Sequence, residues 1–588
     1  MATLAAAAAG TVIDLGGRTF SLGQTLTIDK SVTVRNGTFT CAVDRVAIVL
    51  APKVRLENVA FIRTGPATKN SGALTLNAPN CSLVDVTASS SCGEGLRMGN
   101  GTCNGTQIRG GEYSSSDTNE SITIHLVSGP AHNYDVKISR AVVRHTGFGT
   151  GIGLYNCSRT IVEHCDVRGI RRSPWFQVTG WTGVSGTVYR ALDRIDTTSN
   201  AVYVNDVEYR KYADPASTAP ALNYYTTPGD GYLYINTGTN PSWQRVRTTR
   251  TNGYGIMFYS TSSETLGMRD NLAAHNYVED TDGFGIYYQT LMNVPRNNRT
   301  LQNTLRSVCR GGVTVNDLPF AGIGVFGGLD VQLDGDMIDG VGSTDSPAPG
   351  IDFKASSGVP SMKGSVRGVS VINAMAHGIS LCAGTWQLSD VSARQNAGSG
   401  VTHGNIANPA DILDVTLTGC IASHNALSGA SFESSNGDIE VQVLGGRYTH
   451  NTVRNLNVVR CRNVFIGGGV LSGWAGNIGI HVSGSSQRVI LDGVFLRAGV
   501  GLNVSAGIGD LTINNIINDG SAGTKFNVSG PYKVGGATGT GADWRCTGTP
   551  EGVITAVVGS RCTRTDGGAG TTSYVKESGT GNTGWVAK

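Results

Sequence analysis

Charge, aromatic side chains and long apolar runs are all scarce in this chain. Of its 588 residues, 15% are charged and 7% are aromatic, and the formal net charge is +3, with Lys and Arg scattered. This distribution argues against a nucleic-acid groove, which concentrates positive charge on one face. No apolar run reaches the length of a membrane span, and residues 1–9 lack the basic start and apolar length of a signal peptide. We therefore expect no nucleic-acid partner, no membrane span and no signal-directed export.

Several catalytic and metal-binding signatures are missing as well. The sequence has no HExxH, P-loop, dinucleotide fingerprint or Ser-His-Asp signature. The acidic residues between positions 330 and 339 do not resemble an EF-hand loop, so exposed strand carboxylates explain them better than calcium ligands. The twelve Cys residues show no CxxC spacing, which favours buried thiols over disulfides. We expect no cofactor and no metal ion.

A short sequence phrase, a small or polar residue followed by an apolar one, recurs throughout residues 321–507. Gly322-Ile323 is an example. The apolar residue recurs at intervals of 22 to 29 residues, at positions 323, 351, 379, 401, 430, 456, 480 and 502. A second alternating strand follows within the repeats, for example at residues 387–391, 412–417, 439–443 and 488–491. A period in the twenties with strand alternation indicates a β-solenoid. A leucine-rich repeat would need a fixed Leu framework and helical segments, so we predict an all-β parallel β-helix.

Turn residues fit this architecture. The chain has 82 Gly, and Asn recurs a few residues before successive strands, at Asn373, Asn396, Asn425 and Asn451. Asn side chains at equivalent turns can hydrogen-bond from one coil to the next. We therefore assign these Asn residues a structural role.

The repeat divides the chain into four segments. N-terminal coils occupy residues 1–171, an insertion occupies 172–252, the main coils run from 253 to 530, and a small C-terminal β module covers 531–588. The insertion lacks the repeat and is rich in aromatic residues, including Trp175 and Trp181. Its strand-like run after the turn at 228–230 predicts an antiparallel β module.

Two stretches carry a resemblance to known proteins. Residues 13–20 (IDLGGRTF) resemble the entry coils of the pectate-lyase-like, right-handed β-helix superfamily, which includes phage tailspikes. The tail from residue 548, with residues 549–553 (TPEGV) and 564–588 (RTDGGAGTTSYVKESGTGNTGWVAK), closely resembles a module at the C-terminal end of many tail proteins of double-stranded-DNA phages. This resemblance implies a right-handed helix and a virion component of the phage tail that contacts other tail proteins. It also implies a homotrimer that acts on a host surface polysaccharide, either capsule or lipopolysaccharide.

Carboxylates cluster just after the insertion. Glu279, Asp280 and Asp282 precede one strand, Asp317 stands in the next unit, and Asp352 lies in the unit after that. Neighbouring coils lie about 4.8 Å apart. Carboxylates one coil apart would have roughly the 5 Å separation of a retaining glycosidase, and those two coils apart the roughly 9 Å of an inverting one. We predict that one of these five groups acts as the acid and a second as the nucleophile or base. A solvated acidic turn is the alternative.

Outward positions of the strands also carry rings. Counting from the inward Ile of each unit places Tyr155, Tyr259, Tyr287, Phe326 and Lys354 on the outer face. Flat rings suit sugar stacking, so these residues, with Trp175 and Trp181 of the insertion, are the predicted glycan-binding set. Packing against the insertion or a neighbouring subunit would explain the rings equally well.

The sequence leaves three functions open. The first is a tailspike that binds and hydrolyses a host polysaccharide, and the second is a tail protein that binds glycan without cleaving it. The third is a bacterial, pectate-lyase-like polysaccharide lyase. The fold cannot decide among them, because β-helices host all three. We favour hydrolysis over a lyase reaction, because a lyase would need an Arg or Lys base beside a group that neutralises the substrate's acid, and the sequence shows no such set.

Overall fold

The computed structural model describes most of the chain. The residues outside this description are 1–5, 43–44, 66–71, 100, 117–120, 128–130, 148, 172–175, 179, 186, 192–200, 205–206, 209, 212–223, 227–231, 237–245, 250–252, 261–266, 291–295, 311–319, 344–346, 356–361, 404–411, 435–437, 474–476, 498–500, 506, 519–525 and 535–542. The regular elements of the described residues are all β-strands. None of the described ranges forms a helix with the length and hydropathy needed to cross a bilayer. The predicted all-β class is confirmed.

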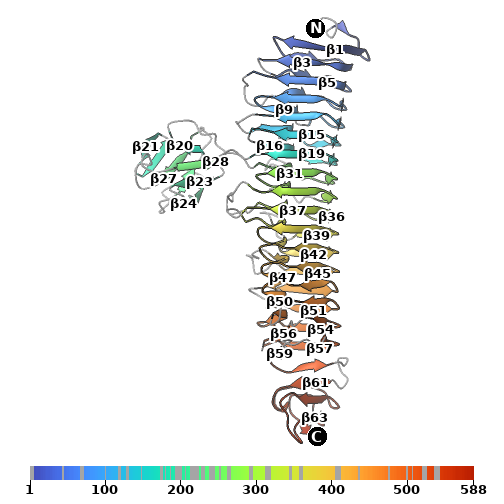
Figure 1. The fold of residues 1–588 in the computed structure, drawn as a ribbon, viewed down its shortest axis with the longest axis vertical. Helices are drawn as coiled ribbons and strands as arrows, with labels where there is room; N and C mark the ends of the chain where they lie inside the picture. Colours follow the sequence, from blue (N-terminus) through green and yellow to red (C-terminus); the bar gives the residue numbers. More distant parts are fainter. Residues whose placement is uncertain are drawn as a thin grey trace. The chain divides into compact units, whose positions relative to one another are not determined.

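Residues 1–328, 336–352 and 356–358 form one compact unit. Each coil adds strands to a two-faced sheet, sheet A, and to a second sheet, sheet B, and strands of successive coils pair in parallel (Figure 1). In this unit sheet A consists of β1 (Val12–Leu22), β3 (Thr33–Cys41), β5 (Arg55–Arg63), β7 (Ser82–Val84), β8 (Thr87–Ser90), β10 (Gln107–Arg109), β11 (Glu112–Ser115), β14 (Lys137–Ser139), β15 (Val142–His145), β18 (Ile161–Glu163), β19 (Asp166–Ile170), β30 (Leu272–Ala274), β31 (Tyr277–Thr281), β33 (Arg299–Leu301), β34 (Thr304–Val308) and β37 (Met337–Val341). Sheet B consists of β2 (Leu26–Ile28), β4 (Ala47–Val49), β6 (Gly72–Leu76), β9 (Glu94–Met98), β12 (Ser121–Leu126), β16 (Gly149–Tyr155), β29 (Ile256–Ser260), β32 (Ile286–Thr290) and β35 (Ile323–Phe326). A short pair, β13 (Asn133–Tyr134) and β17 (Cys157–Ser158), lies outside both sheets.

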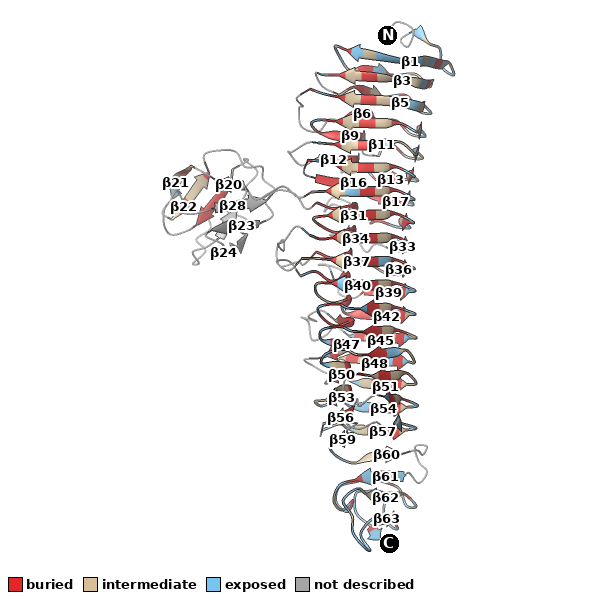
Figure 2. Ribbon diagram, viewed as in Figure 1, coloured by how far each residue is buried: buried red, intermediate tan, exposed pale blue. Residues whose placement is uncertain are grey.

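Strand alternation places the apolar side chains inside the coils. β19 pairs in register with β31, so Val167 lies opposite Val278, and both side chains are fully buried. Their neighbours along each strand, Arg168 and Glu279, point to the outer face, because successive side chains of a strand alternate in direction. Figure 2 shows buried and more exposed residues alternating along the strands. Stacking of these small apolar sets on one another forms the core.

The corner between the two faces of sheet A requires a left-handed backbone. One residue per coil has a φ between 49° and 56° there, at Asn58, Asp85, Arg140, His164, His275 and Gln302. Only Gly and, to a lesser degree, Asn and Asp adopt this conformation without strain. Four of these six corners nevertheless carry Arg, His or Gln, so the stacked coils hold even these residues in the left-handed conformation.

The insertion forms two small sheets that are antiparallel except for the β25–β26 pair. One contains β20 (Phe176–Val178), β28 (Val246–Thr249), β23 (Ala201–Val204) and β24 (Val207–Glu208). The other contains β21 (Trp181–Ser185), β22 (Val188–Ala191), β27 (Tyr234–Asn236), β26 (Tyr224–Thr226) and β25 (Arg210–Lys211). The predicted antiparallel module is confirmed.

Residues 329–335, 353–355 and 359–588 form the second unit, and β38 (Ile351–Lys354) contributes residues to each unit. The sheet A strands of the second unit are β36 (Val331–Asp334), β39 (Met362–Arg367), β40 (Ser370–Ala374), β42 (Gly384–Ser389), β43 (Ser392–Arg394), β45 (Leu413–Thr418), β46 (Ile421–Ser423), β48 (Ile439–Leu444), β49 (Arg447–Thr449), β51 (Asn463–Gly467), β52 (Val470–Ser472), β54 (Arg488–Asp492), β55 (Phe495–Arg497), β57 (Asp510–Asn514), β58 (Ile517–Asn518) and β60 (Tyr532–Val534). Its sheet B strands are β41 (Ile379–Leu381), β44 (Val401–His403), β47 (Ser428–Glu433), β50 (Arg454–Val459), β53 (Ile478–Ser483), β56 (Gly501–Val504) and β59 (Phe526–Val528). Each of the eight phrases found in the sequence is a strand of sheet B.

Buried Asn side chains connect the coils at three of the four predicted positions, whereas the fourth, Asn373, is exposed and has a φ of 59°. Asn396 donates from Nδ2 to Oδ1 of Asn425 at 2.9 Å, and Asn425 donates in the same way to Asn451 at 2.9 Å. All three are buried. The ladder satisfies polar groups that the coil interior would otherwise leave without partners.

The chain ends in a small module of β61 (Asp543–Cys546), β62 (Arg561–Arg564), β63 (Ser573–Lys576) and β64 (Trp585–Ala587). β61 pairs in parallel with β62, and the remaining pairs are antiparallel. Glu551 accepts hydrogen bonds from the backbone N–H groups of Gly584 and Trp585 at 3.1 and 2.8 Å. The predicted C-terminal β module is therefore present with its own small core.

Candidate functional site

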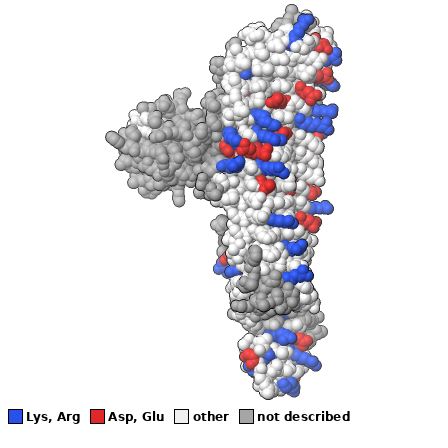
Figure 3. Space-filling model, in the orientation of Figure 1, with Lys and Arg blue, Asp and Glu red and all other residues white. Residues whose placement is uncertain are grey.

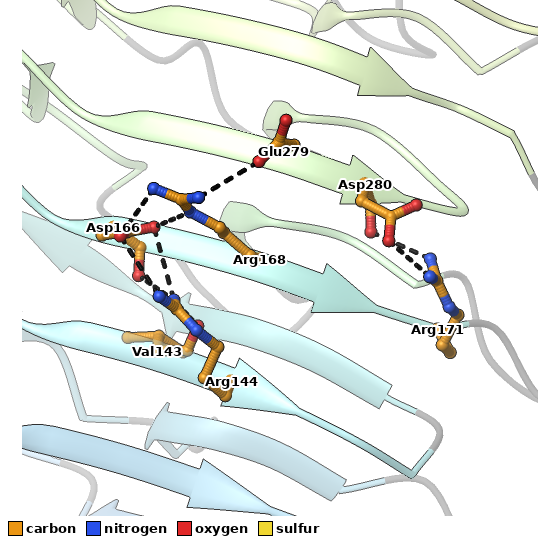
Figure 4. A network of polar contacts seen from close by, with 7 residues as sticks. All are labelled: Val143, Arg144, Asp166, Arg168, Arg171, Glu279 and Asp280. Atoms are coloured by element: carbon orange, nitrogen blue, oxygen red, sulfur yellow. Dashed lines mark hydrogen bonds and ion pairs between the residues drawn. The ribbon is translucent and has the colours of Figure 1, made fainter.

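Two of the five predicted carboxylates, Glu279 and Asp280, lie on sheet A. Glu279 and Asp280 belong to β31, which lies between β19 and β34. Arg168 of β19 donates to Glu279 at 3.3 Å and to Asp166 at 2.6 Å. Figure 4 shows the network continuing from Asp166 to Arg144, whose guanidinium donates to the same carboxylate at 3.1 and 3.3 Å.

Asp280 and Asp282 both face Arg171, which precedes the insertion. Arg171 hydrogen-bonds to Asp280 (Figure 4) and lies 3.8 Å from Asp282, while Arg310 lies 4.0 Å from Asp280. The hydrogen bond from Arg171 lowers the pKa of Asp280, and the positive charge of Arg310 adds to the shift. Asp280 is therefore an anion at neutral pH, which suits a nucleophile or a binding group and not a general acid.

We call Arg144, Asp166, Arg168, Arg171, Glu279 and Asp280 the arginine–carboxylate patch. It borders a groove of about 400 Å³ lined by Arg144, His145, Thr146, Arg168, Gly169, Glu279, Asp280, Ser307 and Arg310. In Figure 3, basic and acidic side chains are interspersed over the visible face and do not form a single positive field. The patch offers hydrogen bonds for a polar ligand, but each of its carboxylates already contacts an arginine.

The other predicted residues are dispersed. Asp317 and Trp175 lie outside the described residues. Asp352 occupies the expected outward position in β38 but is only 2% exposed, and Lys354 of the same strand is partly exposed. Trp181 is buried in β21 of the insertion.

Two of the predicted rings belong to a cluster of aromatic side chains on the outer side of the coils. Tyr287 and Phe326 have ring centroids 5.2 Å apart and are each 4% exposed. Tyr254 and Phe284 pack against this pair, and Phe320 packs against Phe284. Packing therefore explains Tyr287 and Phe326, whereas Tyr155 and Tyr259 are more exposed.

A different constellation lies on the outer face of sheet B. Glu94 and Arg97 belong to β9, His125 to β12, Tyr155 to β16 and Tyr259 to β29. Parallel register places Arg97 opposite His125 and Tyr155 opposite Tyr259. We call these five residues the Glu94–His125 centre.

Hydrogen bonds organise the centre around one carboxylate oxygen. His125 Nδ1 and Arg97 Nη1 both lie 2.6 Å from Glu94 Oε1. The side chains of Glu94 and His125 are 6% and 15% exposed. The second oxygen, Oε2, is buried and has no hydrogen-bond partner among the described residues. An unsatisfied buried acceptor calls for a partner, and a ligand hydroxyl or a water molecule would supply it.

Neighbouring charges determine the protonation of the centre. Burial would raise the pKa of Glu94, but the charges and hydrogen bonds of His125 and Arg97 more than offset it, so the pKa is lowered. An ionised carboxylate only accepts hydrogen bonds, so Nδ1 of His125 is the donor, and Nε2 is the ring nitrogen available to exchange a proton with a ligand. Burial, with smaller effects from Tyr259 and Glu94, raises the pKa of Tyr155 and keeps its hydroxyl protonated.

The rings complete an acid–base set. The ring centroid of Tyr155 lies 5.4 Å from that of His125 and 5.4 Å from that of Tyr259. A base, a protonated hydroxyl and an arginine thus come from adjacent coils, and this combination can remove a proton from one atom and supply one to another. Only Tyr155 and Tyr259 were identified from the sequence. His125 and Arg97 each lie one residue past an inward apolar residue, Ile124 and Leu96, which is the outward position that Tyr287 occupies after Ile286. Applying that count to the earlier units would have found them.

A pair of carboxylates also lies on sheet A of the second unit. Asp414 of β45 is the register neighbour of Glu440 of β48. Glu440 accepts hydrogen bonds from Arg462 at 2.5 Å and from Asn463 at 3.0 Å. Burial, and then the charge of Glu440, raise the pKa of Asp414. Burial around one carboxyl group and an arginine beside the other can separate an acid from a base. Carboxylates that are register neighbours one coil apart also fit the spacing of a retaining glycosidase.

Within the described ranges, no group of three or more His, Cys, Asp or Glu side chains is arranged to hold a metal ion.

Comparison with known proteins gives a fold-level result. No family model matches the chain, and no curated protein matches it by sequence. The periplasmic alginate epimerase AlgG matches with 12% identity and a TM-score of 0.31 over 71% of this chain and 78% of its own. The GH87 alpha-1,3-glucanase of Streptomyces thermodiastaticus strain HF3-3 matches with 12% identity and a TM-score of 0.34, over 89% and 65%. The A-module of mannuronan C-5 epimerase AlgE4 of Azotobacter vinelandii matches with 10% identity and a TM-score of 0.36, over 86% and 91%.

These similar structures are polysaccharide-acting enzymes. Scores this low assign the chain to no family and transfer no activity to it.

Proposed function

We propose that this chain binds a host surface polysaccharide and cleaves it at the Glu94–His125 centre. The observation behind the proposal is the 2.6 Å hydrogen bond between His125 Nδ1 and Glu94, on adjacent coils of sheet B and beside Tyr155. A carboxylate that fixes the tautomer of an imidazole also orients it as a base. The partly exposed Tyr155 and Tyr259 provide ring surface for a sugar beside that base.

The arrangement favours elimination from a uronic acid residue over hydrolysis. His125 Nε2 takes the proton from the carbon next to the uronate carboxylate, and a carbon–carbon double bond forms as the glycosidic C–O bond breaks. The protonated hydroxyl of Tyr155 supplies a proton to the departing oxygen. Arg97 has N–H groups besides the one bound to Glu94, and its charge offsets that of the uronate as negative charge develops. No water is consumed in this step.

Hydrolysis at Asp414 and Glu440 is the second candidate. The raised pKa of Asp414 makes it the acid, and Glu440, which forms an ion pair with Arg462, is the nucleophile. This pair carries out the carboxylate chemistry that the sequence led us to expect near residue 279.

The tail-protein role rests on the sequence of residues 564–588. In this proposal the chain is a virion component that acts at the host cell surface as a homotrimer. Light scattering of the purified full chain at micromolar concentration checks the assembly, and a monomer would contradict it.

The reaction class is tested by the products formed from purified capsule, lipopolysaccharide and polyuronates. Elimination predicts fragments with an unsaturated, ultraviolet-absorbing end and the mass of the parent repeat without added water. Saturated fragments with new reducing ends would support Asp414 and Glu440 instead. Binding without fragments from any of these substrates would leave only the receptor-binding role.

A further inference from the structure

The C-terminal module contains two cysteines whose sulfur atoms nearly touch. Cys546 Sγ and Cys562 Sγ lie 3.0 Å apart, and both residues are buried. Cys546 ends β61, and Cys562 lies in the adjacent parallel strand β62. The two cysteines are two residues out of register, since Trp544 lies opposite Cys562. Their side chains nevertheless converge within one core.

That core is small. It consists of Cys546, Ile554, Ala556, Cys562, Tyr574 and Trp585, with Trp544 packed against it. Such a core buries little apolar surface, and small modules of this kind are commonly stabilised by a cross-link. A disulfide has a sulfur–sulfur distance of about 2.05 Å, so a closing movement of about 1 Å would form the bond.

We propose that Cys546 and Cys562 form a disulfide that fastens β61 to β62 once the chain meets an oxidising environment. Each thiol loses a proton and an electron, and one sulfur–sulfur bond forms. A small-molecule disulfide such as oxidised glutathione accepts the two electrons and two protons and is cleaved to two thiols. The bond closes the segment between residues 546 and 562, which contains Glu551 with its hydrogen bonds to Gly584 and Trp585.

The cross-link acts on the unfolded state of the module. Joining residues 16 positions apart restricts the opened chain and therefore favours the closed module. Because both sulfurs are buried, exchange requires transient opening of the module, so oxidation is expected to be faster during refolding than in the folded protein.

Counting thiols in the full chain tests the bond. One sample is refolded with oxidised glutathione and another with a reductant. Both are then denatured and alkylated, and their masses are measured by mass spectrometry. All twelve cysteines should be alkylated in the reduced sample, and two fewer in the oxidised one. Peptide mapping without reduction should identify a cross-link between residues 546 and 562. Twelve alkylated thiols after oxidation, or a cross-link between other cysteines, would overturn the proposal.

Protease resistance tests the consequence. Oxidised wild-type protein should resist cleavage within residues 543–588 for longer than reduced protein, and Cys546→Ser should abolish this difference. Cys165→Ser is the matched control, because Cys165 is buried and its Sγ lies near backbone oxygens and not near a second sulfur. If the oxidised Cys546→Ser variant resists the protease as long as oxidised wild type does, the proposed stabilising role of the disulfide is contradicted. If that variant fails to fold, the thiol count in wild-type protein still decides.

Discussion

At the residue scale, the chemistry of this chain depends on which carboxylates have arginine partners and which have an imidazole. Asp280 is bound by Arg171, so it remains an anion without a transferable proton. Glu94 instead holds His125, and the proton-transfer function passes to the imidazole. Both carboxylates are ionised, and Glu94, which also contacts Arg97, differs from Asp280 in holding an imidazole.

The lowered pKa of Glu94 predicts how stability depends on pH. A carboxylate whose pKa is lower in the folded state stabilises the fold above its unfolded pKa of about 4.3, and this contribution is lost as the pH falls through the folded value. The variant Glu94→Gln cannot ionise. The difference in unfolding free energy between wild type and Glu94→Gln should therefore be largest above about pH 5 and should shrink towards about pH 3.

Urea unfolding at a series of pH values measures this difference. A constant difference across the series would show that the carboxylate does not gain stability from ionisation in the folded state.

At the scale of the element, each coil is fastened to the next by buried polar side chains as well as by backbone pairing. Asn425 donates to Ala393 O at 3.1 Å and to Asn451 at 2.9 Å, and it accepts from Asn396. It is fully buried. Its removal leaves several donors and acceptors without partners inside the coil.

Asn425→Ala should therefore destabilise the fold strongly. Each buried group left without a partner costs about 1–3 kcal/mol, so we expect a loss of at least about 2 kcal/mol in urea unfolding. Gln442→Ala, at an exposed outward position of β48, is the control and should stay within about 0.5 kcal/mol of wild type. Equal effects of the two substitutions would contradict a structural role for the Asn ladder.

Sequence periodicity was sufficient to locate the sheet B strands from β35 to β56. The eight phrases at 323 to 502 are strands of sheet B, because a buried apolar position recurs once per coil. The partners of the carboxylates were not predictable in the same way. Arg171 and Asp280 lie 109 residues apart, and their pairing depends on β19 stacking directly on β31 across the insertion. Burial of Tyr287 and Phe326 likewise depends on rings that do not follow the repeat.

At the scale of the whole molecule, a solenoid brings together residues that are distant in sequence by stacking coils. Glu94 and His125 are 31 residues apart and become hydrogen-bonded neighbours because β9 and β12 pair in register. Tyr155 follows one coil later, through the pairing of β12 with β16. An outward face built in this way can hold an acid–base set without a loop of its own, so substitutions in such a set need not disturb the core.

The comparison of His125→Gln with His275→Gln tests the central claim most directly. His275 is an exposed corner residue, and the next coil has Gln302 at the equivalent corner with nearly the same φ, 49° against 53°, so this control should fold normally. Initial rates of polysaccharide cleavage are measured for both variants and for wild type, with folding checked by circular dichroism. We expect His125→Gln to lose about 100-fold or more of the rate, because a general base contributes about 10²–10⁴-fold, and His275→Gln to retain the parental rate. Cleavage by folded His125→Gln at the wild-type rate would contradict the assignment of the reaction to the Glu94–His125 centre.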